Sequence, residues 1–183
     1  MSLELFRCRI CGEVYFGSHP SHCPYCGVHG VYLIHISDWK NENLAVTLTD
    51  ISKKNLETTL KLEFNASRLY RASAKKSKSD EIQGYFKYLA RVEKEHYEVV
   101  CKLLGVDISD EINGLSDDVK DTDVENLSIS QKLEEAATKL YRKFSTEAKE
   151  PRVKDFFKAL SDVEADHTKL DIDAISKLNK GAQ

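Results

Sequence analysis

Residues 92–96 read VEKEH, and residues 163–167, which lie 71 positions further along the chain, read VEADH. Each segment contains a glutamate that is followed three positions later by a histidine. Two further pairs keep the same offset: Glu63 with Glu134, and Tyr70 with Tyr141. The chain therefore contains two quasi-equivalent helical hairpins, and a pseudo-twofold packing would bring their special residues face to face.

The apolar residues after residue 50 predict four helices, because they recur at the three- and four-residue spacing of a helix with one buried face. The predicted helices cover residues 51–76, 80–104, 128–149 and 151–178. Residues 107–127 contain eight acids and one lysine, and we expect them to form a crossover connection along the outside of a bundle. The pattern therefore predicts a mainly α protein with a ferritin-like four-helix bundle over residues 51–183.

The repeated glutamates and histidines predict a metal centre inside this bundle. Positions three apart share a helical face, so each glutamate–histidine pair can bind one ion. Ionised carboxylates cannot be buried without positive charge, because desolvation costs roughly several kcal/mol for each. Two cations would supply that charge, and oxygen and imidazole ligands suit iron or manganese. A glutamate from each of two helices and a Glu-x-x-His from each of the other two form the ligand set of di-iron carboxylate bundles. The predicted ligands are Glu63, Glu93, His96, Glu134, Glu164 and His167.

The two repeated tyrosines lie two helical turns after a predicted ligand. Tyr70 follows Glu63, and Tyr141 follows Glu134. They are either plain core aromatics or hydrogen-bond partners of the glutamates. Because a buried tyrosine hydroxyl usually needs a partner, we expect hydrogen bonds to glutamates.

The first 36 residues form a separate module, which contains four of the five cysteines. A unit this small cannot bury enough apolar surface to fold alone, so it needs a covalent or metal staple. Two Cys-x-x-Cys pairs can close a tetrahedral thiolate site for one iron or one zinc ion. These ligands are Cys8, Cys11, Cys23 and Cys26. We expect short strands at residues 5–9, 12–15 and 31–36, and a linker over residues 37–50.

Three polar residues near these motifs receive no functional role. His19 and His22 lie between the cysteine pairs, and we interpret them as loop residues because four cysteines already complete a site. We interpret Asp166, beside His167, as a surface acid.

Charge and composition exclude several classes of partner. The net charge of −3 gives no electrostatic case for binding nucleic acid or an anionic membrane. The uncharged apolar runs are far shorter than the ~20 residues of a membrane-spanning helix. Met1 is followed by Glu4 and Arg7 without an apolar signal segment, so we expect a soluble, cytoplasmic protein.

The cysteine pairs in CRICGEVYFG and CPYCG, together with the duplicated EKEH and EADH motifs, resemble the rubrerythrin family. The rubredoxin-like module stands ahead of the bundle here, as in a reversed-order branch of that family. The resemblance implies a di-iron site in which Glu93 and Glu164 bridge the metals, and a single iron held by the four cysteines. It implies an oxidoreductase that reduces hydrogen peroxide, with oxygen as an alternative acceptor, to water. Electrons would come from an external NAD(P)H-linked reductase or rubredoxin through the cysteine-bound iron.

The resemblance also implies a homodimer, head-to-tail or domain-swapped, in which one subunit's module lies against the other's bundle. The linker looks too short for one chain alone to set the best distance between the two sites. One position departs from the family pattern. Many rubrerythrins have an extra glutamate, used when an iron moves during the redox cycle, where this sequence has Ala137.

Two other functions fit parts of the sequence. A ferritin-like ferroxidase or iron-handling protein needs the same bundle ligands but no electron-carrying module. A non-enzymatic adaptor with a zinc ribbon would use the cysteines alone. Visible colour separates the last case, because a ferric ion held by four thiolates is red and zinc is colourless.

Overall fold

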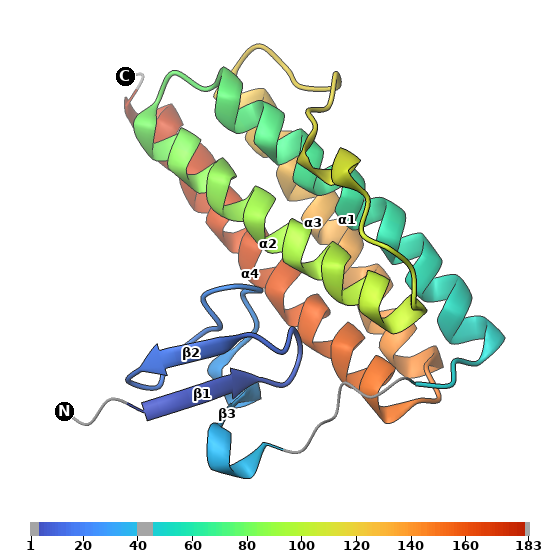
Figure 1. Ribbon diagram of the computed structural model, residues 1–183. Coiled ribbons are helices and arrows are strands. Elements are labelled where there is room, and N and C mark those ends of the chain that lie inside the picture. The colour runs from blue at the N-terminus through green and yellow to red at the C-terminus, as the bar shows by residue number, and fades with distance from the viewer. Residues whose placement is uncertain (1–3, 40–45, 182–183) are drawn as a thin grey trace.

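The computed structural model describes residues 4–39 and 46–181, in which four long helices follow a small sheet (Figure 1). The helices are α1 (Asp50–Lys76), α2 (Asp80–Leu104), α3 (Asp123–Glu147) and α4 (Pro151–Gly181). Helix α1 packs along α2, and α3 packs along α4, as two hairpins should. The predicted mainly α fold, a helical bundle preceded by a small knuckle module, is confirmed. In the part of the chain that the structure describes, no helix combines the length and apolar character needed to cross a membrane.

Helix α3 begins at Asp123, earlier than the predicted residue 128. The hydroxyl of Thr122 accepts a hydrogen bond from the Glu125 amide, and the Glu125 carboxylate accepts one from the Thr122 amide. This capping box satisfies two amide groups that a helix start otherwise leaves unpaired. The first turn of α3 therefore lies inside the acid-rich stretch that was predicted to be wholly a connection.

The remaining connection, residues 105–122, runs beside α1 and contains the short 3-10 helix η3 (Asp110–Asn113). The Arg68 guanidinium donates to the Leu115 carbonyl at 2.9 Å, and the Ser116 amide donates to the Arg68 carbonyl at 3.3 Å. These bonds hold the connection against the bundle while it carries the chain from α2 to α3, which is the course expected of a crossover.

The N-terminal sheet has the antiparallel order β2-β1-β3, with β1 (Glu4–Cys8), β2 (Val14–Gly17) and β3 (Leu33–His35). The strands differ from those predicted because a cysteine-bearing turn occupies residues 9–13. There, the Gly12 amide donates to the Cys8 carbonyl at 2.9 Å. The 3-10 helices η1 (Gly30–Tyr32) and η2 (Ile36–Asp38) shorten the third strand at both ends. We call residues 4–39 the cysteine module.

The predicted linker is described only at its two ends. Its first residues form η2, and the Trp39 ring lies under the Arg7 guanidinium of β1, at 4.3 Å. Residues 40–45 lie outside the described residues, as do residues 1–3 and 182–183.

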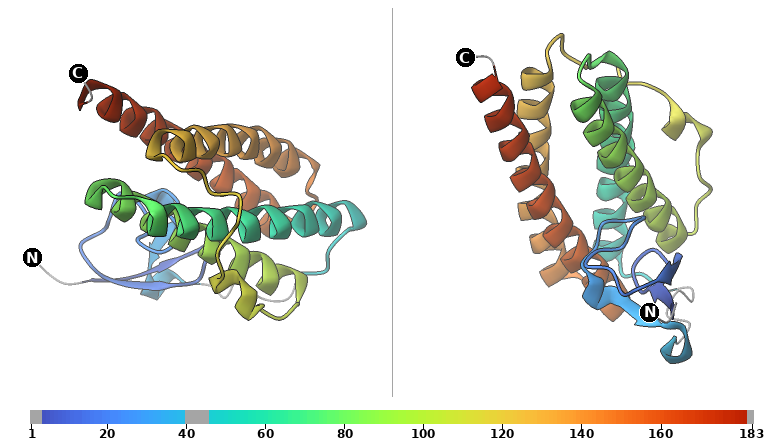
Figure 2. Two further views of the ribbon diagram at one scale, coloured as in Figure 1. Left: turned by 90° about the horizontal axis from the view of Figure 1, so that it is seen from above. Right: turned by 90° about the vertical axis from the view of Figure 1, so that its left-hand side faces the viewer.

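The cysteine module packs against the bundle of its own chain, beside α2 and α4 (Figures 1 and 2). Its buried residues and those of the bundle form one continuous apolar cluster, to which Val28 and Leu33 contribute from the module. A Cβ at Gly27 would lie 3.3 Å from Val163 and 3.5 Å from Val92. The module and the bundle of one chain are therefore in direct contact.

We expect Gly27→Ala to loosen the module from the bundle. Gly27 has φ +73°, and its added methyl group would press on the buried Val163 side chain. Gly105→Ala is the matched control, because Gly105 has φ +68° but nothing within 4 Å of its Cβ position. Left-handed backbone should cost each variant about 1–2 kcal/mol in the free energy of unfolding. Gly27→Ala should lose roughly a further 1 kcal/mol by overpacking.

Urea unfolding measures these costs, and hydrogen exchange over residues 21–30 reports the loosening. Equal losses of stability in the two variants, with unchanged exchange in the module, would contradict this close packing.

Candidate metal centre

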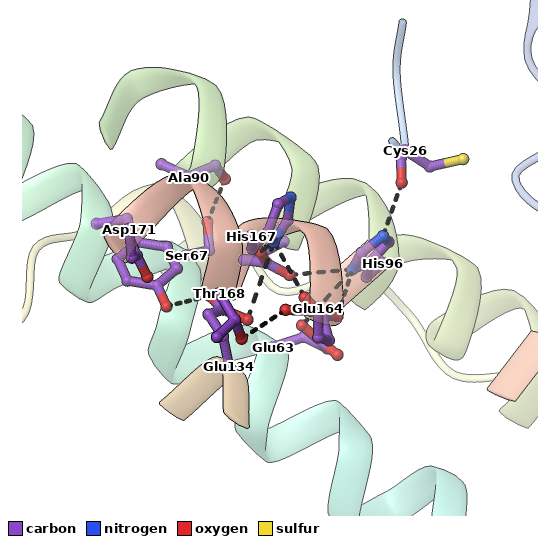
Figure 3. Close-up of polar contacts among 12 residues, drawn as sticks. Cys26, Glu63, Ser67, Ala90, His96, Glu134, Glu164, His167, Thr168 and Asp171 are labelled. Carbon is purple, nitrogen blue, oxygen red and sulfur yellow. Dashed lines mark hydrogen bonds and ion pairs between the residues drawn. The ribbon is translucent and has the colours of Figure 1, made fainter. Parts of the chain in front are cut away.

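All six predicted ligands of the bundle are buried and converge between the four helices. Figure 3 labels Glu63, His96, Glu134, Glu164 and His167, which point toward one another. Each is at most 3% exposed. The glutamates of α1 and α3 face the glutamate–histidine pairs of α2 and α4, because every one of them lies on the buried face of its helix. We call this set the candidate di-metal centre: Glu63, Glu93, His96, Glu134, Glu164 and His167.

The centre consists of two overlapping groups that share two glutamates. One group adds Glu63 and His96 to the shared pair, and the other adds Glu134 and His167; within each, one ligand atom per residue lies within 4.8 Å of the others. Glu93 and Glu164 belong to both groups. This arrangement suits two ions held side by side and bridged by the shared carboxylates.

Each histidine approaches both shared carboxylates through its Nδ1 atom. His96 Nδ1 lies 3.0 Å from Glu93 and 3.5 Å from Glu164. His167 Nδ1 lies 3.0 Å from Glu164 and 3.2 Å from Glu93. The distances mirror one another, as the sequence repeat requires.

The buried acids of the centre need positive charge. Burial raises the pKa of Glu63 to about 8. Burial, followed by the charges of Glu93 and Glu134, raises the pKa of Glu164 well above its ordinary value. Among the described residues, the buried Oε1 atoms of Glu93 and Glu164 accept no well-formed hydrogen bond, although each faces a histidine Nδ1 atom. Cations would replace the retained protons and fill these unused acceptor positions, so the residues present fit two metal ions.

Two tyrosines donate hydrogen bonds across the centre, each to a glutamate of the opposite hairpin. The Tyr70 hydroxyl of α1 donates to Glu134 of α3, and the Tyr141 hydroxyl of α3 donates to Glu63 of α1. Burial raises the pKa of both hydroxyls well above the ordinary value, so both stay protonated and act as donors. The hydroxyls thus orient the two unshared carboxylates.

The two histidines differ in what lies behind them. His96 Nε2 lies 2.9 Å from the backbone carbonyl of Cys26 (Figure 3), whereas the buried His167 Nε2 has no hydrogen-bond partner within residues 4–39 and 46–181. A carbonyl can only accept, so His96 Nε2 carries a proton, and Nδ1, which faces the glutamates, is the atom that would bind a metal ion. The cysteine module therefore touches one half of a symmetric centre.

The four cysteines of the module also converge. Their sulfur atoms lie within 4.8 Å of one another, with Cys8 and Cys26 at 3.7 Å and Cys11 and Cys23 at 3.9 Å. Metal–sulfur bonds of about 2.3 Å place the corners of a tetrahedron about 3.8 Å apart. The Ile10 amide donates to the Cys8 sulfur at 3.4 Å. The cluster fits one tetrahedrally bound ion and is too open for disulfides.

Comparison with known proteins identifies the bundle. Residues 54–122 and 125–183 match the Rubrerythrin family. The chain belongs to the rubrerythrin family. The matched residues carry all six ligands of the candidate di-metal centre, and the cysteine module precedes them.

A hypothetical protein from Pyrococcus furiosus has a similar structure, with a TM-score of 0.60 and 21% identity over 70% of this chain and 90% of that one. This likeness supports the shared fold alone. Among curated proteins, none matches the sequence.

A cavity of about 500 Å³ reaches the centre of this rubrerythrin-family bundle between α1 and α3. Four of the six ligands line it: Glu63, Glu93, Glu134 and Glu164. Ala66 and Ala137, which occupy equivalent positions in the repeat, line it as well. Both alanines therefore border this cavity, each with a side chain of a single methyl group.

The repeat did not reveal a buried acid beside the centre. Asp171 of α4 is fully buried and accepts a hydrogen bond from the Tyr85 hydroxyl at 2.8 Å. The equivalent positions of the other hairpin hold Val100 and Phe156. Because the pair has no counterpart, the symmetry search that found the ligands could not find it.

Substitution of a shared ligand should remove more bound ions than substitution of an unshared ligand. We expect Glu93→Ala to lose both bundle ions, because Glu93 belongs to both groups, and Glu134→Ala to lose one. Elemental analysis of iron-loaded protein measures the content. Glu98→Gln is the control, since this partly exposed acid of α2 pairs with Lys94 and should leave the content unchanged. Equal losses in the two ligand variants would argue against bridging by Glu93.

Asp171 should make stability depend on pH. Burial raises its pKa from 3.8 to about 7, so the folded chain keeps a proton that the unfolded chain releases. The contribution of Asp171 to stability therefore falls as pH rises from about 4 to about 8. Asp171→Asn removes this titration. Between pH 5 and pH 8, the wild type should lose more stability than the variant, by on the order of 2 kcal/mol.

Urea unfolding of both proteins at the two pH values measures this difference. Parallel pH profiles would show that Asp171 is ionised in the folded protein throughout.

Proposed function

We propose that this protein is a non-haem di-iron peroxidase, which reduces hydrogen peroxide to water with electrons that pass through an iron ion in the cysteine module. The module would be rubredoxin-like, in the reversed order of the family. The observation that carries the proposal is the hydrogen bond between Cys26 and His96. It joins a residue of the four-cysteine cluster directly to a ligand of the candidate di-metal centre.

The connection between the two sites is short and buried. Cys26 is a candidate ligand of the module ion, and its own carbonyl group accepts a hydrogen bond from His96 Nε2. His96 Nδ1 then faces Glu63, Glu93 and Glu164. One peptide group and one imidazole ring thus span the distance between the thiolate cluster and the carboxylate cluster. An iron-storage site has no need of such a link.

The substrate would approach from the other side. The cavity of about 500 Å³ opens between α1 and α3, and none of its lining residues belongs to the cysteine module. The histidines and the module lie on the α2 and α4 side. Peroxide and electrons would therefore reach the centre from opposite faces of the bundle.

The chemistry divides between the ions and the chain. Reduction of one peroxide consumes two electrons and two protons and releases two waters. Bound iron would supply the electrons and stabilise the oxide charge that develops. The four cavity-lining glutamates would hold the ions at the inner end of the cavity, which has room for a molecule as small as peroxide. Tyr70 and Tyr141 keep their protons and donate hydrogen bonds to Glu134 and Glu63. These bonds keep the two carboxylates in place while the charge of the site changes.

The electron donor would be an external NAD(P)H-linked reductase or a rubredoxin.

We also propose a homodimer. If the modules of two chains exchanged places, each would make the same contacts with the partner's bundle that it makes here with its own. Light scattering would test the dimer, independently of the peroxidase proposal.

Metal substitution in the module tests the proposed function without changing the sequence. Protein with zinc in the cysteine module and iron in the bundle should lose donor-driven peroxide turnover by at least about 100-fold, since zinc has no redox chemistry. The same protein should still oxidise ferrous iron with oxygen. All-iron protein should be red and should show full turnover with an added reductase and NADH.

Cys8→Ser provides a second version of this test, with Cys101→Ser as its matched control. Cys101 is buried on α2 and lies outside the four-cysteine cluster. Only Cys8→Ser should lose turnover. Peroxide turnover that survives zinc substitution would overturn the role of the module and favour the ferroxidase alternative. A colourless native protein that binds only zinc would favour the adaptor.

A further inference from the structure

Three side chains outside the two predicted metal centres converge where the cysteine module meets α4. His22 and His29 belong to the module, and Asp166 belongs to α4. His29 Nε2 lies 2.7 Å from Asp166 Oδ2, and His22 Nε2 lies 3.7 Å from the same oxygen. One atom of each residue lies within 4.8 Å of the other two.

The module holds the two histidines in place. They flank the second cysteine knuckle and pair across it as an antiparallel bridge. Inside this bridge, the Cys23 amide donates to the Val28 carbonyl at 2.7 Å. The two imidazole rings meet edge to face, with centroids 4.9 Å apart. The knuckle that positions the cysteines therefore also fixes the histidines.

The remaining polar atoms of the cluster are arranged so that ligand atoms stay available. His22 Nδ1 bonds the Ser21 hydroxyl at 3.0 Å, which leaves Nε2 directed at Asp166. Lys169 donates to Asp166 Oδ1 at 2.8 Å, which leaves Oδ2 facing both histidines. Metal-binding imidazoles and carboxylates are commonly oriented by such outer hydrogen bonds.

We propose that His22, His29 and Asp166 form a third metal site, which binds a divalent transition-metal ion and fastens the cysteine module to α4. Two imidazole nitrogens and one carboxylate oxygen suit zinc, iron and related ions, and three protein ligands leave a position open to water. The side chains are between 32% and 49% exposed, so an ion can reach them from solvent.

A simple hydrogen bond between His29 and Asp166 accounts for only part of this geometry. His22 Nε2 points at the same oxygen from 3.7 Å, which is too far for a hydrogen bond. An ion with bonds of about 2.0–2.2 Å would bond all three ligand atoms once His29 Nε2 and Asp166 Oδ2 moved apart from 2.7 Å to the edge of a tetrahedron, roughly 3.4 Å.

Such an ion would join the two parts of the protein that carry the predicted redox sites. Asp166 precedes His167 of the candidate di-metal centre, and His22 precedes Cys23 of the module cluster. A pocket of about 330 Å³ is lined by His22, Asp166 and His167 together, and by Gly27 of the module. Occupancy of the third site would therefore reinforce the packing beside the Cys26–His96 contact. The site does not depend on the peroxidase function proposed above.

Zinc titration of protein with iron in both predicted centres tests the site. Equilibrium dialysis followed by elemental analysis of zinc and iron should find one additional zinc per chain, with the iron content unchanged. Removing one ligand in His22→Ala or Asp166→Asn should weaken this zinc at least about tenfold. His35→Ala is the matched control, because His35 is an exposed histidine of the same module whose ring bonds the nearby Ser37 hydroxyl.

Hydrogen exchange provides a second measurement. Zinc should slow exchange over residues 21–30 in the wild type and in His35→Ala, but not in His22→Ala. Circular dichroism and the visible spectrum of the cysteine-bound iron establish that each variant is folded. No additional zinc, zinc gained only as iron is lost, or equal zinc affinity in all four proteins would overturn the proposal.

Discussion

Four carboxylates buried at one place in a helical bundle impose the main constraint on this structure. Their mutual repulsion and lost hydration would oppose folding unless protons or cations compensate them. The two histidines contact the acids that both ion positions share, and the tyrosines donate to the acids that they do not share. Helix register follows from this requirement, because each ligand must lie on the buried face at the same depth. In the sequence, this symmetry is visible as the 71-residue repeat of the ligands.

The surroundings of the centre are much less symmetric than the centre itself. The Cys26 carbonyl accepts a hydrogen bond from His96 Nε2, whereas His167 Nε2 has no such partner in the part of the chain that the structure describes. Tyr85 of α2 donates a hydrogen bond to Asp171 of α4, whereas the equivalent positions of the repeat hold Phe156 and Val100. The two halves of the bundle therefore share the ligand set but differ in the contacts that surround it.

Most of the centre could be predicted from the sequence, because its ligands recur at helical spacing in two copies. The early start of α3 was also readable in principle, since Thr122 and Glu125 have capping-box spacing. The packing of the module was not predictable from local pattern. It depends on the contact between Gly27 and Val163, residues far apart in the chain that carry no shared motif. Asp166 was interpreted as a surface acid for the same reason, because a single acid has no pattern that reveals its neighbours.

The cavity between α1 and α3 has a consequence for the durability of the cysteines. Thiolates are readily oxidised by peroxides to sulfenic and higher acids, which no longer bind metal in the same way. The four cysteines of the module are at most 3% exposed, and none of them borders the cavity that leads to the glutamates. An oxidant that entered by this route would meet the buried glutamates of the candidate di-metal centre first, with the His96 ring and the Cys26 peptide group still between it and the sulfur atoms.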